Sequence, residues 1–408
     1  MASRLNSSKL KPLVAATLLA AALTSGQAQE AVRPDIGKPL QAAGELIKAG
    51  KYKEALAKVR DADAVPNKNA SESYTIERMR IAAASGAGDA DTAGKSFEAL
   101  AASGKLAQAD KLRMLESLAG TAYRAKDYAK TMQWGQRYFK EGGASGTVRT
   151  LLIQSQYLGG DFAGAARELQ VEITASEKAG QAPAEDRLKL LANATQRMND
   201  TNAYVWAVEK LVTYYPQKQY WTDLLGRLQR KPNFSDRLAL DTYRLSLATG
   251  ATSAAADYME MVQLAVQAGS LNEAQQAMDK GFAAGVLGVG PEAERHKRLR
   301  DLVAKRLAES KAGQAQALSE AKAAKDGGEL LAIGMDQVYG GQAKAGLELM
   351  QQGIAKGTKR PDDAKLHLAI AQLVAGDHAK SAATFRTVQG NDGTADLARL
   401  WALYARKK

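Results

Sequence analysis

Apolar residues recur every three or four positions along most of this chain, which is the spacing of one face of an α-helix. The stripe that precedes Gly160 consists of Val148, Leu151, Leu152 and Tyr157. Similar stripes precede other short turns that are rich in small or polar residues. The pattern therefore predicts units of helix, short turn and helix, in which each helix buries one face.

The turns share a sequence pattern of their own. Each begins with small or polar residues, most continue with an aromatic or apolar residue, and a small residue follows three positions later. The segments with this pattern are 49–59, 87–97, 125–135, 159–169, 201–211, 268–278, 340–350 and 375–385. They begin roughly 40 residues apart, and two intervals are about twice as long. These long intervals predict missing units near Pro232 and within residues 300–315.

Tandem helix pairs are expected to stack, because one amphipathic pair alone cannot bury both of its faces. Small residues on the second helices let neighbouring helices approach closely. These residues are Ala55, Ala93, Ala165, Ala207 and Ala274. We expect an all-α solenoid of about ten antiparallel helix pairs. The apolar stripe and cationic end of residues 395–406 predict a capping helix for this solenoid.

One stretch interrupts the array. Gly285–Pro291 contains three glycines and a proline, a composition that cannot continue a helix. It is either a loop between units or a hinge between two superhelical segments. We therefore predict an N-terminal repeat segment over residues 29–284 and a C-terminal one over 285–408.

The second half of each unit resembles the tetratricopeptide repeat (TPR) family, whose unit is a helix-turn-helix of about 34 residues. The resemblance is carried by Tyr52 with Ala55, by Phe162 with Ala165, and by Phe385. The Trp and the Leu-Gly pair of the family's first helix are mostly absent here. Residues 213–250 also look like exported proteobacterial TPR-like proteins that have no assigned chemistry. The resemblance implies a right-handed superhelix that binds proteins in a concave groove.

In such repeats the first helix of each pair lines the groove, so the resemblance also implies which residues meet a partner. We expect them among first-helix residues that lie outside the packing stripe. They are Arg113, Glu116, Tyr123, Thr150, Gln154, Tyr157, Lys189, Gln196 and Asn199. The alternative is that these are ordinary solvated positions.

A cluster of aromatic residues near the middle of the chain is a second candidate for recognition. It consists of Tyr214, Tyr215, Tyr220 and Trp221. Exposed aromatic side chains can anchor a partner, but such a cluster also suits the joint between adjacent repeats. The sequence leaves both interpretations open.

The N-terminus has the three-part pattern of a secretory signal peptide. Arg4, Lys9 and Lys11 precede the apolar run PLVAATLLAAAL, and a small and polar stretch follows. We predict a signal peptide over residues 1–28 with cleavage after Ala28; an uncleaved anchor or a core helix is the alternative. The chain has no cysteine, which excludes disulfides, thiolate metal sites and a lipidated N-terminal cysteine. A periplasmic location is expected.

The chain is basic, with a formal net charge of +12. Clusters of cations occur at His296–Arg300, Lys305-Arg306, Lys359-Arg360 and the C-terminus. Behind a signal peptide, anionic envelope surfaces or acidic proteins are the expected counterparts, rather than nucleic acid. The alternative is that these runs are solvated helix faces and a frayed tail.

The candidate chemistry of the sequence is weak. Gly159-Gly160-Asp161-Phe162 is similar to a shortened diguanylate cyclase signature, but it lacks the second acidic residue and lies between two helical stripes. The only histidines are His296, His367 and His378, and none has the spacing of a metal site. We expect no cofactor, no metal and no catalysis; the rival hypothesis is an enzyme whose site forms only on folding.

These observations favour a non-catalytic periplasmic scaffold that binds a protein partner in the cell envelope. The alternative is an accessory protein of polysaccharide export or cell-wall assembly, in which the basic patches bind an anionic polymer. No transmembrane segment is expected in the mature chain, because no second long apolar run occurs.

Overall fold

The structure is a computed structural model that describes residues 32–406. The predicted signal peptide lies outside the described residues. The described part is helical, with α-helices α1 to α20, one short 3₁₀ helix and no strand. None of its helices is both long enough and apolar enough to cross a membrane. The prediction of an all-α fold is confirmed.

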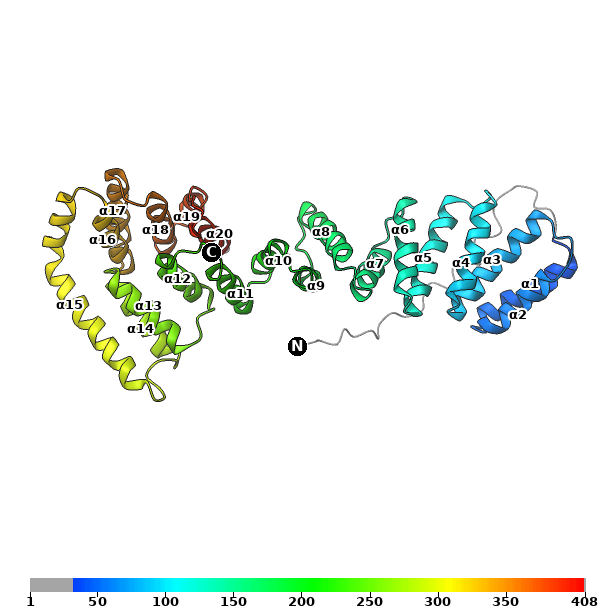
Figure 1. Ribbon diagram of the computed structural model, residues 1–408, viewed down its shortest axis with the longest axis horizontal. Coiled ribbons are helices and arrows are strands. Elements are labelled where there is room, and N and C mark those ends of the chain that lie inside the picture. Colours follow the sequence, from blue (N-terminus) through cyan, green and yellow to red (C-terminus); the bar gives the residue numbers. More distant parts are fainter. Residues whose placement is uncertain (1–31, 407–408) are drawn as a thin grey trace. The chain divides into compact units, whose positions relative to one another are not determined.

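The chain divides into two compact units, each described here by itself (Figure 1). Unit 1 contains described residues 32–179 and 193–200, and unit 2 contains 180–192 and 201–406. The helices of unit 1 are α1 (Pro34–Lys48), α2 (Tyr52–Asp63), α3 (Ala70–Ala87), α4 (Ala90–Ala102), α5 (Gln108–Arg124), α6 (Tyr128–Lys140), α7 (Gly146–Leu158) and α8 (Phe162–Lys178). The division between the units passes through α9 (Glu185–Arg197).

Unit 2 contains the remaining helices. They are α10 (Thr201–Tyr214), α11 (Lys218–Gln229), the 3₁₀ helix η1 (Asp236–Leu238), α12 (Ala239–Thr249), α13 (Ala255–Gln267), α14 (Leu271–Ala283), α15 (Ala293–Ala323), α16 (Gly328–Tyr339), α17 (Ala343–Lys356), α18 (Pro361–Val374), α19 (His378–Phe385) and α20 (Thr394–Ala405).

The turns predicted from the repeated pattern are all present. Each is followed by a helix, which begins at Tyr52, Ala90, Tyr128, Phe162, Thr201, Leu271, Ala343 or His378. A break between helices also lies near Pro232, where a missing unit was predicted. Successive helices pack as pairs, for example α1 with α2 and α5 with α6. The array is therefore built from TPR-like helix pairs.

The core of unit 1 lies between stacked pairs. Phe97 on α4 is fully buried, and its ring meets Trp134 on α6 edge to face, with 5.7 Å between ring centroids. Burying one such side chain stabilises a fold by about 1.5–3 kcal/mol. Ala93 and Ala119 are also fully buried in this cluster, where small side chains allow close helix packing.

Ion pairs between neighbouring helix pairs of unit 1 recur at a constant separation in sequence. Three of them join residues that are 39 positions apart: Arg33 with Glu72, Lys130 with Asp91, and Arg137 with Glu98. The constant separation shows that consecutive pairs in unit 1 stack with a conserved offset. Exposed pairs of this kind add little stability each, but Glu72 is only 1% exposed.

Glu72 makes the stability of unit 1 depend on pH. Its hydrogen bond from Arg33 lowers its pKa from an ordinary value of 4.5 to about 2. The stabilisation is therefore complete above about pH 4.5 and is lost as the pH falls towards 2. We expect the urea midpoint of unit 1 to fall across this window, and to fall less in Glu72→Gln. Hydrogen exchange of α1 and α3 at several pH values measures this, and an unchanged pH profile in Glu72→Gln would contradict it.

Unit 2 departs from a simple open stack, because its end returns to its beginning. Helix α20, where the capping helix was expected, contacts α10 and α12 as well as α18 and α19. The Trp401 indole N–H donates to the carbonyl of Asp241 over 3.3 Å. Lys231 pairs with Asp396 at 2.6 Å, and Arg237 pairs with Asp363 at 2.7 Å. Segments about 125–165 residues apart in sequence are thus held side by side.

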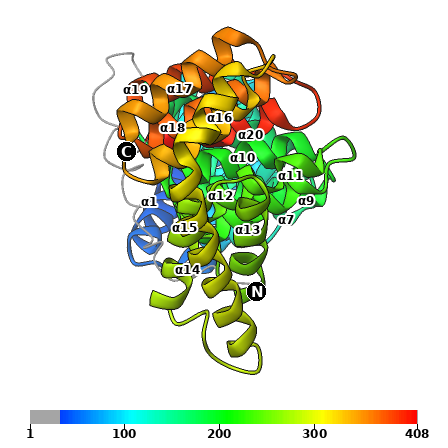
Figure 2. The same cartoon turned by 90° about the vertical axis from the view of Figure 1, so that its left-hand side faces the viewer.

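The prediction of a missing unit within residues 300–315 is wrong. A single helix of 31 residues, α15, runs through this span (Figure 2). Its only glycine, Gly313, is helical and exposed, so no residue supplies a turn. Between residues 304 and 317 only Leu307 is even half-buried. The spacing of the repeats predicted a turn here, but the local sequence favours a continuous helix.

Gly285–Pro291 forms the loop between α14 and α15, as its composition predicts. Gly285, Gly288 and Gly290 all adopt left-handed backbone conformations, with φ between 67° and 79°. The loop lies inside unit 2. The boundary predicted at residues 284 and 285, and a hinge there, stay predictions.

Helices α16 and α17 approach each other unusually closely. A Cβ atom added to Gly346 would lie 2.4 Å from the carbonyl oxygen of Gly334, and one added to Gly334 would lie 2.5 Å from that of Gly346. Gly327 and Gly353 face each other in the same way. The two backbones are therefore in direct contact, which only glycine permits.

Candidate functional site

The first helices of the pairs form a continuous row in unit 1. Helix α1 contacts α3, α3 contacts α5, and α5 contacts α7. No comparable contact joins the second helices α2, α4, α6 and α8 to one another within the described residues. We call α1, α3, α5 and α7 the first-helix row. The predicted partner-binding residues on α5 and α7 therefore belong to this row.

The three predicted residues on α5 differ in their surroundings. Arg113 is exposed, and Glu116 accepts a hydrogen bond of 2.8 Å from the hydroxyl of Ser145. The Tyr123 ring is half-buried, 6.1 Å from the ring of Tyr128, and burial raises the pKa of Tyr123. Glu116 thus also holds the start of α7. Arg113 is exposed and pairs with Asp110 on the same helix at 3.2 Å.

The predicted residues on α7 are half-buried. Thr150, Gln154 and Tyr157 lie three or four positions apart, on one side of the helix. The Tyr157 hydroxyl forms a hydrogen bond with the side chain of Asn193, and its ring meets Phe162 edge to face at 5.4 Å. Tyr157 therefore has a structural contact in addition to any role in recognition.

The remaining predicted residues are less uniform. Gln196 is exposed on α9, and Asn199 lies beyond the end of α9, in a turn with a φ of 57°. Lys189 pairs with Glu185 at 2.8 Å, and this hydrogen bond raises the pKa of Lys189. Lys189 belongs to unit 2, so it is not placed relative to the first-helix row.

The aromatic cluster serves as a joint. Trp221 is only 3% exposed, so it does not present an anchor to a partner. The Tyr215 hydroxyl donates to the carbonyl of Pro183 over 2.8 Å, and the Tyr220 hydroxyl donates to Glu185 over 2.7 Å. These bonds join the turn after α10 and the first turn of α11 to the start of α9. The structure therefore favours the second of the two interpretations.

The Gly159–Phe162 stretch is a turn and a helix cap. Gly160 has a φ of 85°, and the carboxylate of Asp161 accepts a 2.8 Å hydrogen bond from the backbone N–H of Gly164. This is the N-cap arrangement that satisfies a free backbone donor at a helix start. The similarity to a cyclase signature therefore has a structural cause.

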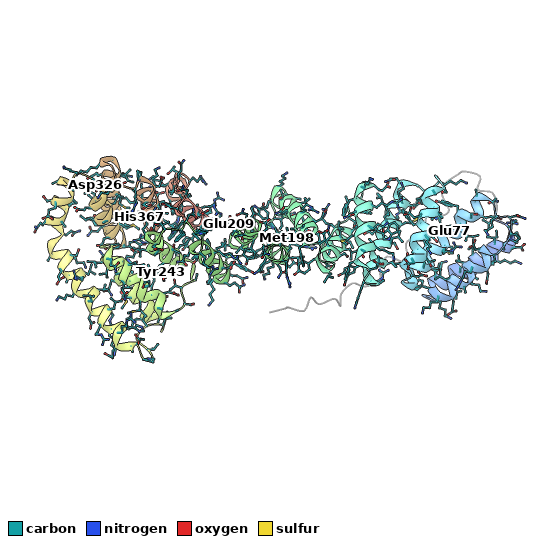
Figure 3. The ribbon with its side chains drawn as sticks, viewed as in Figure 1. Glu77, Met198, Glu209, Tyr243, Asp326 and His367 are labelled. Carbon is teal, nitrogen blue, oxygen red and sulfur yellow. The ribbon has the colours of Figure 1, made fainter. Side chains whose placement is uncertain are left out.

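Unit 2 contains a buried ion cluster that sequence reasoning missed. Arg244 on α12 binds both carboxylate oxygens of Glu273 on α14, at 2.7 and 2.6 Å, and one oxygen of Asp241 at 2.6 Å. The other oxygen of Asp241 lies 3.0 Å from Nε2 of His367 on α18. Figure 3 labels His367. We call these four residues the Arg244 cluster. Asp241, Arg244 and Glu273 are between 1% and 6% exposed.

The electrostatics of the Arg244 cluster are balanced. Burial alone would raise the pKa of Asp241, but the charges and hydrogen bonds of His367 and Arg244 lower it to about 2. Burial opposes the charge of Arg244, yet Glu273 and Asp241 raise its pKa well above the ordinary value. Both carboxylates are already paired with cations, so the cluster is structural. Sequence gave only one signal, the spacing of Asp241 and Arg244, because their partners are 29 and 126 residues away.

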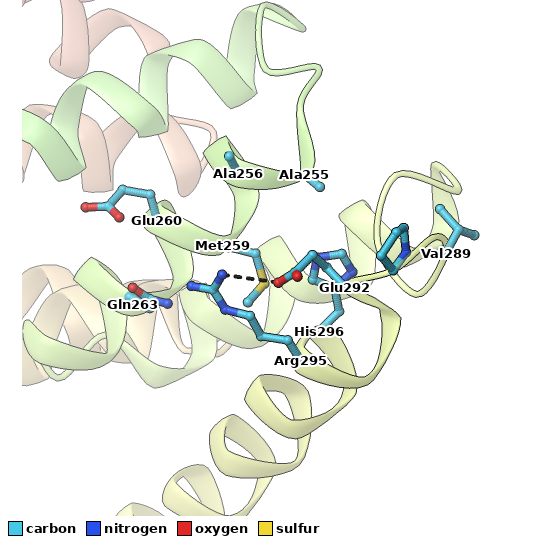
Figure 4. Close-up of a pocket in the computed structure, with 10 residues that line it drawn as sticks. Ala255, Ala256, Met259, Glu260, Gln263, Val289, Glu292, Arg295 and His296 are labelled. Atoms are coloured by element: carbon cyan, nitrogen blue, oxygen red, sulfur yellow. Dashed lines mark hydrogen bonds and ion pairs between the residues drawn. The ribbon is translucent and has the colours of Figure 1, made fainter.

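A cavity of about 430 Å³ lies between α13 and the start of α15 (Figure 4). Its lining residues are Ala255, Ala256, Met259, Glu260, Gln263, Val289, Pro291, Glu292, Arg295 and His296. The sequence pattern places His296 only in a basic run. No group of three or more His, Asp and Glu residues in the described part could hold a metal ion.

No protein-family model matches the sequence, and no curated protein matches it. Among solved structures, it is similar to a chain of the Naa15/Naa10 complex bound to HypK-THB, at 16% identity and a TM-score of 0.28; the match covers 89% of this chain and 58% of that one, less than two thirds of its length. The TPR domain of P58(IPK) matches at 12% identity and a TM-score of 0.22, and the match covers 91% of this chain and 98% of that chain. Yeast Tom70 matches at 11% identity and a TM-score of 0.24, and the match covers 91% of this chain and 96% of that chain. The TPR-like, all-α assignment rests on the chain's own helix pairs.

Proposed function

We propose that this protein is a non-catalytic scaffold that binds a protein partner through the first-helix row of unit 1. The supporting observation is the asymmetry between the two sets of helices. Helices on the inner side of a curved stack lie closer together than those on the outer side, so the first-helix row forms the inner, concave side. Extended concave surfaces are what stacked repeats use to bind proteins.

The setting of the proposed interaction is the bacterial cell envelope. This part of the proposal rests on the signal-peptide pattern of residues 1–28 and on the absence of cysteine. A periplasmic scaffold would require neither a cofactor nor a nucleic acid. Cleavage after Ala28 is tested by determining the N-terminal sequence of the exported protein; an intact leader on a cytoplasmic protein would contradict it.

Arg113 provides the sharpest test of the binding surface. The mature protein is used to capture partners from envelope extracts, and the affinity of the captured partner is then measured with wild type and Arg113→Glu. We expect a loss of about tenfold or more, because central cationic residues of a recognition surface often contribute more than 1 kcal/mol. Arg113 is exposed and its ion pair with Asp110 is a surface pair, so losing that pair should cost no more than about 1 kcal/mol of stability.

Lys140→Glu is the matched control for Arg113→Glu. It makes the same change of charge on α6, outside the first-helix row, at a position that is also exposed. The affinity should stay within about twofold of wild type, since surface substitutions away from an interface are close to neutral. If both variants lose affinity equally, the partner responds to the overall charge of the protein and the first-helix row is not its binding surface.

An anionic polymer is the second candidate ligand. The specific observation is on α15, where Arg298, Arg306 and Lys311 are exposed and form no ion pair with any described residue. This arrangement suits an accessory protein of polysaccharide export or cell-wall assembly. Polymer binding would weaken strongly with added salt. If capture returns no protein while the mature chain binds polygalacturonate in a salt-dependent way, this second function replaces the first.

A further inference from the structure

We propose that the cavity between α13 and α15 binds one apolar side chain of an extended segment of the protein partner, together with that segment's backbone carbonyl. The proposal rests on the proposed function, because it names a second contact for a protein partner. It concerns unit 2 alone. Its test uses small probes, so it can fail or succeed independently of the first-helix row.

The cavity has a fixed wall. Nδ1 of His296 accepts a 3.1 Å hydrogen bond from the backbone N–H of Gly288, and His296 is only 4% exposed. Gly288 has a φ of 79°, a conformation that suits glycine. The side chain of Leu287 next to it is buried in the core of unit 2. The imidazole is therefore held in one orientation by the loop.

This orientation leaves one nitrogen of His296 as an unused donor. A neutral imidazole has one donor and one acceptor nitrogen, and Nδ1 is the acceptor here. The proton is therefore on Nε2. Nε2 forms no hydrogen bond with any described residue, and His296 lines the cavity. Nε2 is not fully enclosed, so a ligand in the cavity that brings an acceptor oxygen can bind this donor.

The rest of the lining is apolar at depth and polar at the edge. Met259 is buried, and Ala255 and Pro291 add apolar surface beside it. Val289, at the edge, is 57% exposed, which is unusual for a large apolar side chain. A cavity of about 430 Å³ falls in the lower part of the usual range of about 300–1,000 Å³ for ligand sites. An apolar side chain fits this volume and lining.

The charges at the edge favour a neutral acceptor over an anionic one. Glu260 and Glu292 are both exposed, against the single cation Arg295. Arg295 is already 3.3 Å from Glu292 (Figure 4). A carboxylate ligand would meet a net negative edge, whereas a peptide carbonyl would not. The amide of Gln263 can accompany further peptide groups, because it both donates and accepts.

The test uses blocked amino acids with the mature full-length chain. The probes are N-acetyl-leucine amide and N-acetyl-phenylalanine amide, and N-acetyl-glycine amide is the control that lacks an apolar side chain. Saturation-transfer NMR measures binding. We expect millimolar binding of the first two probes, as is usual for ligands with so few atoms, and binding of the glycine amide that is about tenfold weaker or absent.

Two variants separate the cavity from the rest of the surface. Ala256 is exposed and lines the cavity, so Ala256→Trp should fill it and reduce probe binding by about tenfold or more. Ala308→Trp makes the same change at an exposed position of α15 that does not line the cavity. Its probe binding should equal that of wild type. Equal binding by all three proteins would overturn the proposal.

NMR of the histidine side chains shows which nitrogen of His296 carries the proton. The chain has only three, so spectra of protein labelled with ¹⁵N in histidine contain three side-chain sets, and His296→Phe identifies one of them. We expect the set of His296 to show the Nε2–H tautomer. Its Nε2 signal should move when N-acetyl-leucine amide binds, while those of His367 and His378 stay fixed. An Nδ1–H tautomer, or an unmoved Nε2 signal, would overturn the assignment of the donor.

Discussion

Arg244→Met is expected to destabilise unit 2 by about 3–5 kcal/mol. Met keeps most of the volume of the side chain but leaves the buried carboxylate of Glu273 without its cation, and leaves Asp241 with His367 alone. An unpaired charge in a protein interior is far more costly than a lost surface contact. Hydrogen exchange of α12 and α14 in increasing urea measures the loss within unit 2.

The control and the rescue for this variant use the same chemistry. Arg295→Met breaks an ion pair in which both side chains are 60% exposed, so it should cost no more than about 1 kcal/mol. Adding Glu273→Gln to Arg244→Met should recover part of the stability, because the buried charge that has lost its cation is then removed. A double variant that is less stable than Arg244→Met would show that lost packing, not the unpaired charge, causes the destabilisation.

Gly346→Ala is expected to destabilise unit 2 by about 1–3 kcal/mol, although it adds only one methyl group. That methyl group would lie 2.4 Å from the carbonyl oxygen of Gly334, so α16 and α17 must move apart. Backbone cannot yield as a flexible side chain can. The measurement is the shift of the urea midpoint, together with hydrogen exchange of α16 and α17.

Gly313→Ala is the matched control and should have the opposite sign. Gly313 lies in the exposed interior of α15, with no atom near its added Cβ. Alanine is the better helix former by roughly 0.5–1 kcal/mol, so this variant should be slightly more stable than wild type. If both variants shift stability in the same direction, the close contact of α16 and α17 is not the reason.

The positions of the turns could be predicted because the chemistry of a turn is local. At Gly160 and Asp161, for example, a left-handed glycine is followed by a capping carboxylate, and neither depends on distant residues. The period of the array is not a local signal, and it suggested a turn within residues 300–315 that does not exist. Continuous helix formers prevailed there, and α15 is the result.

The candidate sites could be predicted from the sequence only in part. The row to which Arg113 and Gln154 belong follows from the repeat pattern, because first helices meet first helices. The Arg244 cluster does not follow from it, since His367 is 126 residues from Asp241. The orientation of His296 depends on one backbone N–H of a loop. Such contacts are set by tertiary packing, and no periodicity in a single sequence reveals them.

The return of α20 to α10 and α12 also limits how unit 2 can change in evolution. An open stack can gain or lose a repeat by duplication or deletion, since each repeat touches only its neighbours. In unit 2 an inserted pair would separate Lys231 from Asp396 and Arg237 from Asp363. Unit 1 has no such closure among its described residues, so lengthening of this protein by whole repeats is expected there, while unit 2 keeps a fixed number.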